Sequence, residues 1–165
     1  MDTATIHMLF EYTRWAHRRV WSCAEQLSDE DYQRDMGYSW GSVHSQLVHI
    51  MAAEWLWLRR LHGESPTSLP GAVEYPTRAA LRQQWDALEG DMRTYLASLT
   101  DADLAAEFDY KSTRGQARRS NVGAILLHVF NHGTDHRAQA LAMIDRLGGE
   151  TVGQDLLTYL VEQGK

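Results

Sequence analysis

The feature that most constrains this chain is residues 120–148, where buried-type residues recur at the spacing of one helix face. The positions at intervals of three or four are Val122, Ile125, Val129, His132, His136, Ala140, Met143 and Leu147. Ser120 is a suitable N-cap, and Gly148 a suitable stop at the C-terminal end. The pattern therefore predicts one long helix with two histidines in the middle of its apolar seam.

The two histidines in this seam are four residues apart, so their rings project from neighbouring turns of the same face. Two neutral imidazoles that replace core residues need hydrogen-bond partners or a metal ion. His132 and His136 are therefore candidate ligands of one metal ion. A pair of hydrogen-bonded histidines in the core or in an interface is the alternative that this motif alone leaves open.

Three further segments have the apolar periodicity of amphipathic helices. They cover residues 3–27, a segment that starts between Ser39 and Ser42 and ends near Leu61, and residues 77–99. All three prolines fall within residues 64–76, which predicts a loop between the second and third of these helices.

Shorter elements are predicted between and after the helices. Residues 28–31 and 100–103 have the spacing of capping boxes, each at the start of a short segment. Residues 108–118, around Arg114-Gly115, are predicted to form a small hairpin, and residues 155–162 a short tail helix. Without a convincing sheet, the pattern favours a single domain over residues 1–165, of the all-α class, folded as a four-helix bundle.

The charge and cysteine content exclude several functions. Sixteen basic residues against 22 acidic ones give a formal net charge of −6, which argues against a nucleic-acid or membrane-surface partner. The single cysteine, Cys23, excludes an intramolecular disulfide and suits a reducing cytoplasm. The start Met1-Asp2 lacks the basic region of a signal peptide, and no apolar run approaches the roughly 18 residues of a membrane span. We therefore expect a cytoplasmic location.

Helix bundles hold metal ions through side chains on facing helices. None of the eight histidines has an acidic residue three positions before it, which argues against a carboxylate-bridged di-iron centre. A mononuclear histidine site remains, with its third ligand among the histidines of the first two predicted helices: His7, His17, His44, His49 and His62. Spacing does not choose between them, although His49 is in mid-helix beside the apolar face, at a height that matches the pair on the last helix.

Three sequence segments in this order resemble the DinB/YfiT-like family of metal-dependent bundle proteins. They are Y-T-R-W-A at residues 12–16, L-V-H-I at residues 47–50, and F-N-H-G-T-D-H-R at residues 130–137. The sequence departs from the family at Asp135, where a histidine is common, and at Ala138, where a glycine is common.

The resemblance implies an up-down-down-up bundle and a metal triad of His49, His132 and His136. Three histidines without cysteine or carboxylate leave a coordination position open, as in catalytic rather than structural zinc sites, with metal–nitrogen distances of about 2.0–2.1 Å. We expect a divalent metal ion, zinc or nickel. Arg137 either binds a substrate carboxylate or forms a surface or interface salt bridge.

Two kinds of function are consistent with these residues: a metal-dependent enzyme and a non-catalytic metal-binding protein. Relatives of this fold include transferases that use low-molecular-weight thiols such as bacillithiol, mycothiol or glutathione, so the resemblance implies a small-molecule thiol and an electrophilic substrate as partners. A metal there would stabilise the thiolate or, in a hydrolase, lower the pKa of bound water towards 7. The alternative is a non-catalytic metal-binding protein of a stress response. Catalytic residues beyond the ligands are not predicted.

The tryptophans favour a homodimer. Six are many for one small bundle, and Trp55 and Trp57 lie about 200° apart around a helix, so one must leave the core face. Aromatic residues outside a core tend to mark interfaces. The alternative is that they cover loops of their own chain.

Overall fold

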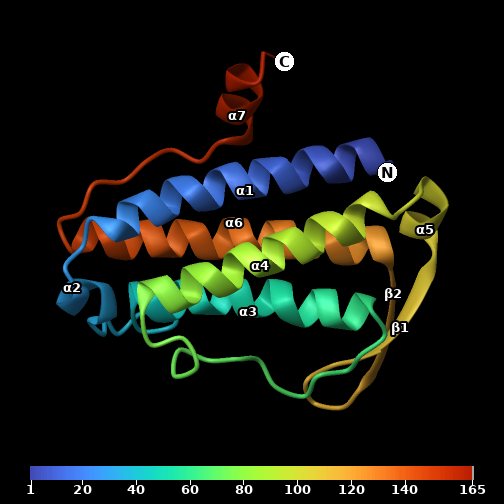
Figure 1. Ribbon diagram of the computed structural model, residues 1–165, viewed down its shortest axis with the longest axis horizontal. Helices are drawn as coiled ribbons and strands as arrows, with labels where there is room; N and C mark the ends of the chain where they lie inside the picture. Colours follow the sequence, from blue (N-terminus) through green and yellow to red (C-terminus); the bar gives the residue numbers. More distant parts are fainter. Residues whose placement is uncertain (165) are drawn as a thin grey trace.

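The computed structural model describes residues 1–164, and four long helices form most of it (Figure 1). They are α1 (Thr3–Glu25), α3 (Val43–Leu61), α4 (Arg78–Ala97) and α6 (Val122–Arg146). The prediction of a mostly helical four-helix bundle is confirmed.

Each long helix begins after a residue whose side chain accepts a hydrogen bond from a backbone N–H of the first turn. This bond satisfies one of the donors that have no partner inside the helix. These N-caps are Asp2, Ser42, Thr77 and Asn121. Ser120 was predicted as the N-cap of the helix that is now α6, and this prediction is wrong by one residue. Ser120 pairs with Phe108 in a strand, and the helix begins only after that pairing ends at Asn121.

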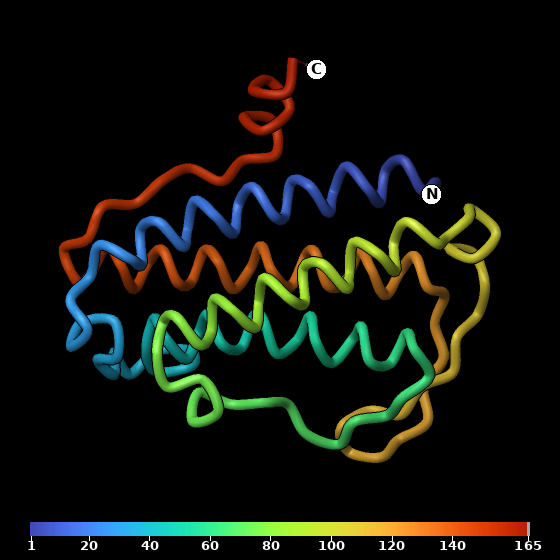
Figure 2. Tube along the Cα trace, in the orientation of Figure 1, coloured from blue at the N-terminus to red at the C-terminus, as the bar shows by residue number. Residues whose placement is uncertain are grey.

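The helices α1 and α6 run in one direction, and α3 and α4 in the other (Figures 1 and 2). The segment between Leu61 and Arg78 therefore travels back along the bundle, which explains why this proline-containing loop is so long.

Short elements connect the long helices or follow the last of them. They are α2 (Asp29–Gln33), α5 (Asp101–Ala105), β1 (Glu107–Lys111), β2 (Ala117–Asn121) and α7 (Leu156–Glu162). The strands form an antiparallel hairpin, and α7 stands apart from the four long helices beside α1 (Figure 1). Tyr159 of α7 packs on Tyr12 of α1.

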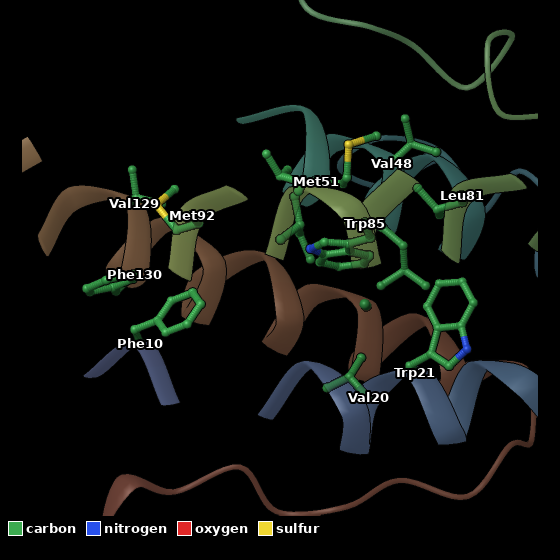
Figure 3. Packing of buried hydrophobic residues seen from close by; sticks show 14 of the residues in the cluster. Phe10, Val20, Trp21, Val48, Met51, Leu81, Trp85, Met92, Val129 and Phe130 are labelled. Carbon is green, nitrogen blue, oxygen red and sulfur yellow. The ribbon is translucent and has the colours of Figure 1, made fainter. Parts of the chain in front are cut away.

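The core lies between the four helices (Figure 3). Leu81, Trp85 and Met92 of α4 are buried there, as their spacing predicts. His132 and His136, however, are only half-buried, so the seam of α6 opens towards solvent at the two histidines. Within residues 1–164, no helix has the length and apolarity needed to cross a membrane.

Candidate metal centre

Three histidines converge between α3 and α6. His49 comes from the middle of α3, and His132 and His136 come from successive turns of α6. One ring nitrogen of each lies within 4.8 Å of the others, and Nε2 of His49 lies 3.1 Å from Nε2 of His132. The structure thus brings together the three residues that the family resemblance indicated.

The other four candidates for a third ligand lie elsewhere. His7 and His62 are exposed, and His62 packs on Tyr95 at the end of α3. His44 is buried against Tyr32, with ring centroids 5.2 Å apart. His17 is buried against another face of α6, beside Trp85. Only His49 faces the pair on α6. His17 lies at a similar height, beside Gly133, but on another face of that helix.

The geometry and charge of the three rings suit a divalent metal. A tetrahedral ion with nitrogen ligands at about 2.0–2.1 Å needs neighbouring nitrogens about 3.3–3.4 Å apart, close to the observed 3.1 Å. Burial, and then the neighbouring histidines, lower the pKa of His132 to about 3; burial and His136 lower that of His49 to about 4. Burial also lowers the pKa of His136. The rings are therefore neutral at pH 7, as metal ligation requires.

Gln46 is a member of the site that the sequence analysis missed. Its side-chain amide lies 2.6 Å from Nδ1 of His136, and its Nε2 also donates to the His136 carbonyl at 3.2 Å. Gln46 is buried one turn before His49 on α3. This three-residue spacing places both side chains on one helix face, and it is the signal that could have identified Gln46.

Trp40 forms a wall of the site. Its ring stacks on His49, with centroids 3.9 Å apart and an interplanar angle of 19°. The preceding residue, Ser39, has a φ of 51°, a conformation that non-glycine residues rarely adopt, and its hydroxyl contacts Gln139 of α6. The loop before α3 is therefore held in a strained turn that places Trp40 over the imidazole.

A cavity of about 300 Å³ lies beside His49, the one histidine of the three that lines it. Its lining comes from the loop before α3, from α3 and from the returning loop: Trp40, Ser45, Val48, His49, Leu69, Pro70, Gly71 and Ala72. The lining is mostly apolar, and His49 is its one ionisable side chain. This volume lies at the lower end of the range for small-molecule sites.

The two interpretations of Arg137 are both wrong. The residue is fully buried, its Nε donates to Gln154 at 2.7 Å and its Nη2 to Thr134 at 2.9 Å. It points away from the metal-binding face, because the helix turns about 100° between His136 and the next residue. Arg137 therefore neither faces substrate nor forms a surface salt bridge.

Two other residues lie outside the triad. His128, one turn before His132, packs on Trp57 and lines a separate cavity of about 170 Å³. Cys23 is buried in the core, and burial raises the pKa of its thiol, which makes it a poor nucleophile.

Comparisons with known proteins agree with this fold. The sequence model of the DinB family matches residues 1–164. The protein called DinB from Bacillus subtilis (strain 168) is 23% identical over 162 residues, which cover 92% of this chain and 91% of that protein. The crystal structure of a DinB-like protein from Bacillus cereus ATCC 10987 superposes with a TM-score of 0.61 at 18% identity, over 88% of this chain and 94% of that one.

Proposed function

The chain belongs to the DinB family, and we propose that it is a metal-dependent enzyme whose His49, His132 and His136 hold one divalent ion, zinc or nickel. The observation that carries this proposal is the convergence of three neutral imidazoles, one of which, His49, also lines a cavity. A structural zinc site is usually closed by four protein ligands, whereas three ligands leave a position for a small molecule.

The ligand atoms follow from the contacts of each ring. His49 and His132 turn their Nε2 atoms towards each other. Nδ1 of His136 faces Gln46, which leaves Nε2 of His136 for the ion. When bound, such an ion supplies a Lewis acid that can stabilise a thiolate or polarise an electrophile.

Thiol transfer to an electrophile is the reaction class that we favour. The mostly apolar cavity would take an uncharged electrophilic substrate next to His49, while the half-buried rings of His132 and His136 leave access for a small thiol. Trp40 covers one face of His49 and would exclude water from that side. Hydrolysis, with water in place of the thiol, is the second candidate, and a non-catalytic metal-binding protein of a stress response is the third.

Metal analysis tests the ligand set. Purified protein should contain about one divalent ion per chain, and His49→Ala, His132→Ala and His136→Ala should each lose most of it. His62→Ala is the matched control, because it removes an exposed histidine at the end of the same helix as His49. Full metal content in His49→Ala would show that the third ligand lies elsewhere.

Turnover with and without added thiol separates the functions. A panel of electrophiles should be converted only with thiol and metal present, and His132→Ala should be inactive. Turnover that needs metal but no thiol would indicate a hydrolase. No turnover above that of His132→Ala, in a protein that binds metal, would favour the non-catalytic alternative.

A further inference from the structure

A second polar cluster lies inside the bundle, where α1, α3 and α6 meet. It consists of four side chains that are almost completely shielded from solvent: Arg14, His17, Glu54 and Arg137. Its position on α6 is rotated by about 100° from the metal-binding face. The cluster takes no part in the function proposed above, so its role is a separate question.

Some polar atoms of this cluster have hydrogen-bond partners and others have none. Glu54 accepts from Arg14 Nη2 at 2.5 Å and from Trp85 Nε1 at 2.9 Å, so both of its oxygens are engaged. Within residues 1–164, Arg14 Nε, Arg137 Nη1 and both ring nitrogens of His17 have no hydrogen-bond partner. Nε2 of His17 lies 3.7 Å from Glu54, which is too far for a hydrogen bond. Buried donors without partners are rare in proteins and need an explanation.

Two of these unpartnered nitrogens, Arg137 Nη1 and His17 Nε2, lie next to Gly133. A Cβ at Gly133 would lie 3.1 Å from Arg137 Nη1 and 3.6 Å from His17 Nε2. Apart from the backbone of α6 and the adjoining residues, these are the only heavy atoms of the described chain within 4 Å of that position. A glycine in mid-helix is unfavourable compared with alanine. Here the absence of a side chain leaves a small space beside the two nitrogens, which we call the cradle; a methyl group placed in it would already contact Arg137 Nη1 closely, at 3.1 Å.

The charge of the cluster favours an anion over a neutral ligand. Two guanidinium groups, Arg14 and Arg137, are buried with a single carboxylate, so one positive charge has no counter-charge. Burial, followed by the charges of Arg14 and Arg137, holds the pKa of His17 well below its usual value, so this ring stays neutral. An unpaired buried charge is costly, and a bound anion would remove that cost.

We propose that Gly133, Arg137 and His17 enclose a binding site for one small inorganic anion of the size of chloride. Arg137 Nη1 donates a charged hydrogen bond to it, and Nε2–H of His17 donates a second from α1. The anion thus joins α1 to α6 directly beside the turns that carry His132 and His136.

Bromide, which scatters anomalously, is the direct probe. Protein dialysed against sodium gluconate and then crystallised with sodium bromide should show an anomalous peak between Arg137 Nη1 and His17 Nε2. Density without an anomalous signal would identify a water molecule and overturn the proposal. Direct contact between His17 and Glu54, with no density in the cradle, would also overturn it.

Thermal melts test the site in solution. At constant ionic strength, replacing gluconate by chloride should raise the melting temperature of the wild-type protein in a saturable way, because the anion binds only the folded state. Gly133→Ala fills the cradle and should abolish this response. Gly90→Ala is the matched control: it adds the same methyl group in the middle of α4, where a Cβ would meet no atom within 4 Å, and should keep the response. Equal responses of the two variants, or none in the wild type, would contradict the proposal.

Discussion

The side-chain amide of Gln46 lies 2.6 Å from Nδ1 of His136. The amide nitrogen faces this atom, while the amide oxygen has no hydrogen-bond partner within residues 1–164. A histidine that binds a metal through Nε2 carries its proton on Nδ1 and donates it to an acceptor. Rotating the amide of Gln46 by about 180° would present its oxygen to that proton, so metal binding should be coupled to the orientation of this amide.

We predict that Gln46→Ala weakens zinc binding by about tenfold or more, because His136 loses the group that orients its ring. Gln46→Glu should retain most of the affinity, since a carboxylate can accept the same proton. Chelator competition measures the affinity, with Gln83→Ala as a control at an exposed position of α4. Unchanged affinity in Gln46→Ala would mean that His136 is oriented by other contacts.

The four long helices were predictable, because their apolar period and capping residues are local signals. The spacing of Leu81, Trp85, Leu88 and Met92 identifies the buried face of α4 without knowledge of its partners. The last helix was misplaced only at its start, where the hairpin register, a pairing between separate strands, decides the boundary.

The site was predictable only in part. Periodicity brought His132 and His136 together, but choosing His49 needed the family resemblance, because spacing along one helix carries no information about the facing helix. Trp40 could not be predicted, since it reaches His49 from an irregular loop. Nor could the burial of Arg137, which depends on Gln154 in the segment after α6.

Stability should depend on pH through the same histidines. In the folded, metal-free protein the pKa of His49 is about 4 and that of His132 about 3, against about 6.5 in an unfolded chain. Between these values the unfolded chain binds more protons, so the free energy of unfolding falls as the pH falls from about 6.5 towards 4. Urea unfolding of the metal-free protein between about pH 7 and pH 5 should show this trend. The slope should be shallower in His132→Asn, and an equal slope in that variant would contradict the assignment.

Removing one partner of the buried pair of Arg14 and Glu54 should be strongly destabilising. Glu54→Ala leaves the guanidinium of Arg14 buried without its carboxylate and also removes the partner of Trp85, so we expect a loss of about 3–5 kcal/mol. Urea unfolding measures the loss, and the double variant with Arg14→Met provides the test of coupling. Its destabilisation should be well below the sum of the two single ones. Additive losses would show that the two residues act independently.

We expect the protein to be a homodimer, but through exposed apolar residues of α7 and not through the tryptophans. Trp15 packs on Tyr159 of α7 and Trp57 on Tyr110 of the hairpin, so their own chain covers these two rings. The apolar side chains left exposed include Leu157 and Val161 of α7, which are 72% and 66% accessible.

A second copy of the chain would shield this face of α7, since neighbouring apolar side chains at such exposure are typical of interfaces. Sedimentation at about 50 μM should therefore show a dimer, and the double variant Leu157→Glu, Val161→Glu should be monomeric because it places charges in the contact. Val73→Glu is the control: Val73 is 91% exposed in the loop before α4, away from α7, and its replacement should leave the dimer intact. A wild-type protein that sediments only as a monomer at this concentration would exclude the homodimer. A dimer that persists in the double variant would place the interface on another face.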